Sequence, residues 1–273
     1  MKYSICSITY GSCGSWLPTY TIDETMRRVS RIGYDALEIV TASPHAWPYY
    51  LDKGKRGQIA KWFAEYKLEC SALVPYIGGG PGSNPASDLK EEREWTAQYL
   101  KDVIGLAAEW NAKLVPYMAG WAMYGVKKAD AWKNSVAMLK DIGRYAGDKG
   151  VSLCISPATT ESNVVDNAED AMAMMEEVNL PNVALMFDTM CPYGKNQDPA
   201  DYVRIMGKNL KMIHVCDYGR QAPGSCGADF IQLTKALKEI KYSGYMTMEL
   251  ASTRSTHADS IARKSLEYLK SIE

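Results

Sequence analysis

Short apolar runs alternate along the chain with longer amphipathic segments. The runs are rich in β-branched and aromatic residues, whereas the segments between them repeat apolar positions with the period of a helix. Eight runs predict strands at residues 2–8, 35–40, 68–74, 113–118, 151–156, 183–188, 211–217 and 244–250. Because helical segments separate them, the pattern predicts successive βα units around a parallel sheet, and therefore an α/β fold.

Capping residues mark the ends of the predicted helices. Thr21 or Asp23 is a suitable start for one helix, and Gly33 a suitable end. Another helix is predicted to follow Asp88. Residues 78–88 (GGGPGSNPASD) are rich in glycine and proline and follow the third predicted strand, so we interpret them as an active-site loop and not as a linker.

The length of the chain indicates how many domains it forms, and its charge indicates which classes of partner it can bind. The 273 residues suit one domain, and we expect residues 1–273 to form a single (β/α)8 TIM barrel. The 31 basic residues nearly balance the 32 acidic ones, for a formal net charge of −1, which disfavours nucleic acid and anionic membranes as partners.

No apolar run is long enough to span a membrane, and the first residues lack the pattern of a signal peptide. Seven cysteines without a CxxC pair favour reduced thiols, so we expect a cytoplasmic protein.

Ionisable residues near the carboxyl ends of the predicted strands are the candidates for chemistry, because barrels of this kind place their active sites there. Asp188, His214 and Glu249 come from three consecutive strands. Two carboxylates and an imidazole are a ligand set for a divalent metal such as Mn²⁺, Co²⁺, Mg²⁺ or Zn²⁺. Glu38 and Asp217 also end strands. The alternative for each acid is a structural ion pair with a nearby Lys or Arg.

Aromatic residues also gather in the segments after the strands. The chain has 18 Tyr and 7 Trp but only 3 Phe, which favours rings that combine an apolar face with a polar group. Such rings suit the wall of a sugar pocket. The alternative is that they shield the top of the barrel or form a subunit contact. They are Tyr10, Trp16, Trp47, Tyr76, Tyr117, Trp121, Tyr124, Tyr193 and Tyr218.

Ordered motifs along nearly the whole chain resemble a known family. These are MKYSICSITYGS, GYDALEIV, GLAAEWNAKLV, GVSLCISP, MFDTM, HVCD and GYMTMEL. Together they resemble the sugar phosphate isomerase and epimerase superfamily, the xylose isomerase-like barrels. The segments SPHAWP, AGWAMYG and ESNVV are most similar to the group that contains fructoselysine 3-epimerase and the ketose 3-epimerases.

This resemblance implies a metal held by four side chains of the last four strands, and two glutamates that move a proton beside a ketone. Asp188, His214 and Glu249 match three of the metal ligands, and Glu249 also matches one proton-transfer glutamate. Arg220 matches an arginine that binds substrate. As further contacts to a sugar we expect the pocket-wall residues Trp16, His45, Trp121, Cys191 and Ser156.

Two positions depart from the family pattern. The glutamate of the fifth strand is replaced by Ser156 or Ile155, depending on the alignment, and a histidine after the sixth strand is replaced by Cys191. Glu161 could supply the missing acid or base. Alternatively, thiols of Cys191, Cys216 and Cys226 gather near His214 and shift the metal towards Zn²⁺.

The sequence therefore predicts a sugar isomerase or epimerase that acts on a ketose or a sugar conjugate by metal-assisted proton transfer. The rival hypothesis is a barrel that binds a sugar without catalysis, or that works only with a small partner subunit, as in enzymes that cleave C-glycosides. Assembly into a homo-oligomer is a further expectation.

Overall fold

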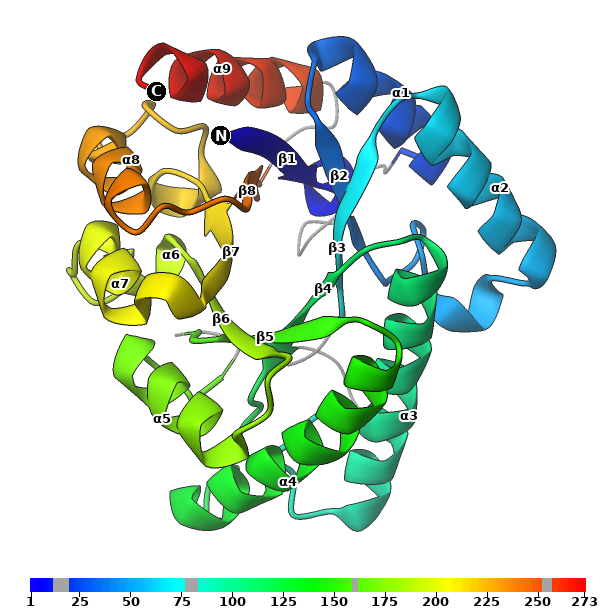
Figure 1. The fold of residues 1–273 in the computed structure, drawn as a ribbon, viewed down its shortest axis with the longest axis vertical. Helices are drawn as coiled ribbons and strands as arrows, with labels where there is room; N and C mark the ends of the chain where they lie inside the picture. The colour runs from blue at the N-terminus through cyan, green and yellow to red at the C-terminus, as the bar shows by residue number, and fades with distance from the viewer. Residues whose placement is uncertain (12–19, 77–82, 159–161, 252–256) are drawn as a thin grey trace.

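Eight parallel strands form one sheet that curves into a nearly closed barrel surrounded by helices (Figure 1). The computed structural model describes residues 1–11, 20–76, 83–158, 162–251 and 257–273. Hydrogen-bonded neighbours follow the order β3-β2-β1-β8-β7-β6-β5-β4, and β3 lies next to β4 where the ring closes. This arrangement confirms the predicted (β/α)8 architecture.

The strands and helices alternate along the described chain. The strands are β1 (Lys2–Cys6), β2 (Ala36–Val40), β3 (Glu69–Val74), β4 (Leu114–Met118), β5 (Ser152–Ser156), β6 (Val183–Asp188), β7 (Leu210–Val215) and β8 (Tyr245–Met248). The α-helices are α1 (Ile22–Ile32), α2 (Lys53–Glu65), α3 (Lys90–Glu109), α4 (Lys128–Asp148), α5 (Ala168–Val178), α6 (Met190–Tyr193), α7 (Pro199–Met206), α8 (Phe230–Glu239) and α9 (Ala258–Ser271). Short 3-10 helices are η1 (Ser7–Tyr10), η2 (Pro48–Tyr50), η3 (Gly207–Asn209) and η4 (Tyr218–Arg220).

Every predicted strand is present, with ends that differ by at most a few residues. The caps of α1 are also as predicted. The Thr21 side chain accepts a hydrogen bond from the backbone N–H of Glu24 at 3.3 Å, and Gly33 ends the helix with a left-handed φ of 98°. In the described part of the chain, no helix has the length and apolar character that crossing a membrane requires.

The apolar core has two parts, inside and outside the sheet. The larger part lies between the strands and the surrounding helices. The smaller part fills the barrel interior with Ala72, Cys154, Ala184, Met186 and Met212. These apolar side chains fill the middle of the barrel. Polar side chains that point inward further along the strands therefore lie beyond them, at the carboxyl ends of the strands.

Asn84 joins the loop after β3 to the loop after β4. Its Oδ1 accepts hydrogen bonds from the backbone N–H groups of Trp121 at 2.9 Å and Ala86 at 3.1 Å, while its Nδ2 donates to the Trp121 carbonyl at 3.0 Å. Gly120 passes so close that a Cβ there would lie 2.2 Å from Asn84 Oδ1. Two loops at the mouth of the barrel are thereby held together.

We expect Gly120→Ala to lower the free energy of unfolding by about 1–3 kcal/mol more than Gly125→Ala. Both glycines have a left-handed φ, of 87° and 91°, but a Cβ at Gly125 would meet nothing within 4 Å. The two variants therefore share the backbone strain, and only the first has the clash with Asn84. Urea denaturation measures the free energy of unfolding of each variant. Equal decreases in the two variants would contradict the prediction, because they would show that the close contact with Asn84 does not matter for stability.

Candidate functional site

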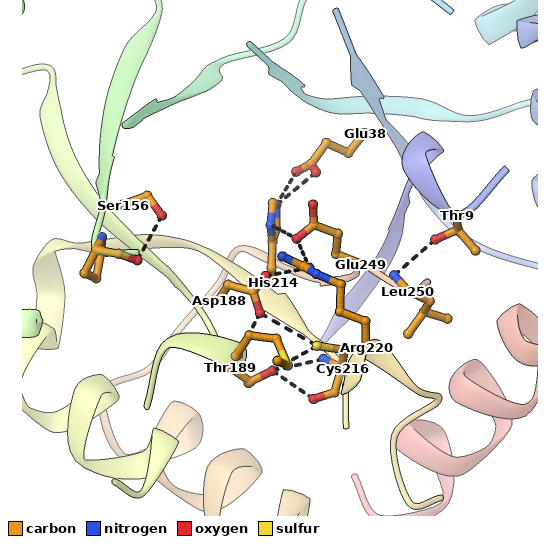
Figure 2. A network of polar contacts seen from close by, with 12 residues as sticks. Thr9, Glu38, Ser156, Asp188, Thr189, His214, Cys216, Arg220, Glu249 and Leu250 are labelled. Carbon is orange, nitrogen blue, oxygen red and sulfur yellow. Dashed lines mark hydrogen bonds and ion pairs between the residues drawn. The ribbon is translucent and has the colours of Figure 1, made fainter. Parts of the chain in front are cut away.

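Three ionisable side chains from neighbouring strands converge at the carboxyl end of the barrel (Figure 2). Asp188 ends β6, His214 lies in β7, and Glu249 directly follows β8. The strand register pairs Asp188 with His214 and His214 with Thr247, so Glu249, two residues beyond Thr247, faces the same side. Each of the three offers a ligand atom within 4.8 Å of the others. The structure thus brings together the three predicted metal ligands.

A fourth ionisable residue, Glu38 of β2, reaches this cluster from across the barrel. Its carboxylate lies 2.9 Å from His214 Nε2, while His214 Nδ1 lies 3.0 Å from Glu249 Oε2. Glu38 is fully buried, and His214 is only 4% exposed. The imidazole therefore lies between two carboxylates in the barrel interior. The sequence marked Glu38 as a strand-end acid but did not place it in the site.

Burial and charge together set the protonation of these groups. Burial opposes a charge on His214, but the Glu38 and Glu249 carboxylates outweigh it and raise the pKa of His214 well above its ordinary value. Burial also opposes a charge on Glu249, yet His214 and Arg220 hold the pKa of that carboxyl well below its usual range. For Asp188, burial prevails over the attraction of Arg220 and raises the pKa to about 6. Two neighbouring carboxyls with pKa values driven apart are a feature of proton-transfer sites.

Arg220 bridges the two carboxylates of the cluster. Its Nη1 lies 2.8 Å from Asp188 Oδ2 and 2.5 Å from Glu249 Oε2. Its side chain remains 29% exposed, so the guanidinium lies at the boundary between the cluster and the mouth of the barrel. The resemblance assigned this arginine to substrate binding, and its position beside the acids is compatible with that role.

The turn that carries Arg220 is strained and held from both sides. Gly219 and Arg220 both have a left-handed φ, of 66° and 58°, and for the arginine this costs about 1 kcal/mol or more. The Arg220 carbonyl accepts a hydrogen bond from Ala251 N at 2.9 Å. Asp217 is fully buried, and its carboxylate accepts from the backbone N–H groups of Tyr218 and Cys226, each at 2.8 Å. Asp217 is thus a strand-end acid that shapes the loop instead of joining the cluster.

The residues that replace family positions lie outside the acid cluster. Ser156 is buried at the end of β5, and within the described residues its Oγ lies 3.5 Å from the carbonyl of Pro157 (Figure 2). The Cys191 thiol is directed towards the carbonyl of Asp166 at 3.6 Å and the hydroxyl of Tyr202 at 3.9 Å. Their substrate contacts stay predictions.

The three cysteines considered as extra ligands do not gather around His214. Cys216 Sγ lies 3.7 Å from Asp188 Oδ1, beside the cluster. Cys226 is exposed, and Cys191 is directed away. Of these three thiols, Cys216 is the one whose described contacts include an acid of the cluster.

His45 lines a hollow of about 390 Å³ where β1, β2 and β3 end. Its ring nitrogens lie 3.0 Å from Ser7 Oγ and 3.2 Å from the carbonyl of Tyr20. Burial lowers its pKa to about 4, so the ring is neutral near pH 7. The hollow continues over Trp47 and Tyr76.

Trp121 lines a second hollow, of about 720 Å³, together with Tyr124 and Asn163. The other two predicted contacts, Trp16 and Glu161, lie outside the described residues. Among the aromatic residues expected in the pocket wall, Tyr10 and Tyr117 are instead buried in the core. Residues of the acid cluster line neither of these two hollows, which lie at the ends of other strands of the barrel.

The donor set of the cluster suits a divalent cation. Asp188 and Glu249 supply oxygen ligands, and His214 supplies an imidazole nitrogen. A ligating histidine usually gives its other N–H to a carboxylate, and Glu38 stands in that position relative to His214 Nε2. Three protein donors would leave coordination positions open to substrate oxygens, as in catalytic sites.

Comparison with known proteins assigns the barrel to a family. The model of the family described as "Xylose isomerase-like TIM barrel" matches residues 26–272. A fructoselysine 3-epimerase of Shigella flexneri is 28% identical over 257 residues, which cover 92% of this chain and 93% of the relative. An L-ribulose 3-epimerase of a Methylomonas strain is 24% identical over 258 residues, or 88% of each chain.

Solved structures agree in fold. A D-psicose 3-epimerase crystallised with D-fructose superposes with a TM-score of 0.86 at 19% identity and covers 100% of this chain and 99% of its own. A 3-keto-D-glucoside 4-epimerase of E. coli has a TM-score of 0.82, also at 19% identity, with 99% of both chains covered. At such identities the likeness extends to the fold alone.

We expect Glu38→Gln to weaken Mn²⁺ binding by about 10- to 100-fold, the usual effect of changing a carboxylate that orients a ligating histidine. Glutamine can still accept the hydrogen bond of His214 Nε2, so the substitution removes the charge and little else. Isothermal titration with Mn²⁺ measures the change. Glu69→Gln, at an exposed carboxylate paired with Lys2, is the matched control. Equal affinity in all three proteins would contradict a role for Glu38 in the site.

Proposed function

The chain belongs to the family of xylose isomerase-like TIM barrels, and on that basis we propose that it is a sugar epimerase or isomerase. The reaction would move a proton at the carbon next to a carbonyl of a ketose or a sugar conjugate. The observation that carries this proposal is the convergence of Asp188, His214 and Glu249 at the mouth of the barrel. Relatives named as sugar epimerases, which align over most of the chain, support the same reaction class.

Asp188, His214 and Glu249 would hold a divalent cation, which we propose is Mn²⁺, Co²⁺, Mg²⁺ or Zn²⁺. When bound, such a cation supplies Lewis acidity that makes the C–H beside a carbonyl more acidic. Glu38 would keep His214 oriented through its Nε2. Arg220, between the acids and the mouth, would bind a substrate hydroxyl or carbonyl oxygen by donating hydrogen bonds.

Glu249 is the base of this proposal. Its low pKa keeps it ionised at neutral pH, and contacts of Oε2 with His214 and Arg220 fix the side chain. One base can take a proton from one carbon and return it to the adjacent carbon on the same face, while a proton passes from one substrate oxygen to the other, which gives isomerisation. Inversion of a carbon needs an acid on the opposite face. Because position 156 is a serine, which cannot act as this acid, we propose Glu161 for the role. This part of the proposal rests on the sequence alone.

The His45 hollow indicates what the rest of the substrate is like. Among the described residues that line it, none is Asp, Glu, Lys or Arg, and His45 is neutral at pH 7. Trp47, Tyr50 and Tyr76 provide aromatic surface. Val40, in its wall, lies two residues beyond Glu38 on β2, so the hollow opens at the same mouth. We propose that it receives an uncharged part of the substrate, which stacks on these rings.

Two measurements on the purified protein test the proposed function. Elemental analysis should find a divalent metal, and deuterium from solvent should enter one or more sugars in a panel of ketoses and neutral ketose conjugates. Asp188→Asn should lose the metal and slow the exchange by about 10²-fold or more. Asp201→Asn, at an exposed acid of α7, should change neither.

The product distinguishes the two reactions. Exchange with inversion supports an epimerase, and exchange with formation of an aldose supports an isomerase. Absence of both metal and exchange across the panel would reject the catalytic proposal. Sugar binding without turnover would then favour the barrel that needs a partner subunit.

A further inference from the structure

Four lysines surround a hollow at the opposite end of the barrel from the acid cluster. Lys113 directly precedes β4, Lys211 lies near the start of β7, Lys208 lies in η3, and Lys241 follows α8. All four line one hollow of about 310 Å³ and are exposed. We call this feature the lysine hollow. It lies where strands begin, far along the barrel axis from the ends of β6, β7 and β8.

The positive charge of the lysine hollow is uncompensated. Elsewhere at this end of the barrel, basic and acidic groups pair: Lys2 Nζ lies 2.6 Å from Glu69, and the amino group of Met1 contacts Glu273. Within the described residues, by contrast, no ion pair includes any of the four lysines. The chain as a whole has a formal net charge of −1, so the excess of positive charge at the lysine hollow is local and does not reflect a basic protein.

The floor of the hollow is built by close backbone packing. The Tyr242 hydroxyl donates a hydrogen bond to the Tyr245 carbonyl at 2.9 Å. A Cβ at Gly244 would lie 2.5 Å from that hydroxyl and 2.8 Å from the Lys211 carbonyl, so only glycine fits there. Leu114 and Ile240 add apolar surface. The four lysines therefore line a defined concave surface instead of an open face.

We propose that the lysine hollow binds a small organic phosphate that carries several negative charges. Lysine binds phosphate as a point charge, and several lysines around one concavity favour a ligand whose charges are close together. The volume is near the lower end of the range for small-molecule sites. The near-neutral chain and the small concave shape favour such a ligand over nucleic acid. This site is independent of the proposed reaction at the other end of the barrel.

Titration with inorganic pyrophosphate at low ionic strength tests the proposal. The wild-type protein should bind one equivalent with saturation. The double variant Lys208→Gln/Lys211→Gln should bind at least about tenfold more weakly, because two of four charges are lost. The control Lys61→Gln/Lys264→Gln removes two exposed lysines from the outer helices α2 and α9 and should bind like wild type. Thermal melts check that each variant is folded.

A second control separates the two ends of the barrel. Asp188→Asn changes the acid cluster and should leave pyrophosphate binding unchanged. The proposal is overturned if wild type shows no saturable binding, or if the lysine-hollow variant binds as well as wild type. It is also overturned if the helix-surface control weakens binding equally, since the effect would then be general electrostatic attraction. Loss of binding in Asp188→Asn would place the pyrophosphate at the barrel mouth.

Discussion

The structure of the barrel mouth depends on the balance of buried charge around His214. A carboxylate with no access to water is strongly unfavourable unless a cation or several donors compensate it. Glu38 is fully buried, and the ionisable group that compensates its charge is His214, 2.9 Å away. His214 in turn contacts Glu249, and Glu249 contacts Arg220, which also binds Asp188. Removing one member would leave an uncompensated charge in the interior.

Under the proposed function, this network would let the protein hold a cation although the fifth strand ends in serine. Three carboxylates face one guanidinium and one imidazole, so the cluster stays negative when the imidazole is neutral. A divalent cation that binds Asp188 and Glu249 must share them with the guanidinium of Arg220 or displace it. Arg220 has the exposure that such a movement requires, and its backbone stays fixed through Ala251. Metal binding and substrate contacts of Arg220 are therefore expected to be linked.

Much of this arrangement follows from the order of residues in the strands. A parallel register places residues of equal height side by side, which is why the strand-end positions of Asp188, His214 and Glu249 predicted their convergence. The role of Glu38 could not be predicted in this way, because its contact spans the barrel interior and depends on how the ring closes.

Asp217 is a second residue whose role could not be predicted from its position at the end of a strand. It resembles a site acid in sequence, yet backbone N–H groups of its own loop occupy its carboxylate. Cys191 follows Asp188 closely but lies in α6, which directs its thiol towards Tyr202.

We propose that the negative charge around His214 forms a cation site. The most direct measurement is anomalous diffraction from crystals of the wild-type protein grown with Mn²⁺. We expect a single strong peak at the barrel mouth in contact with Asp188, His214 and Glu249, with Arg220 moved from its bridging position or sharing the carboxylates. Absence of any peak at saturating Mn²⁺, with Arg220 still joining Asp188 to Glu249, would contradict it.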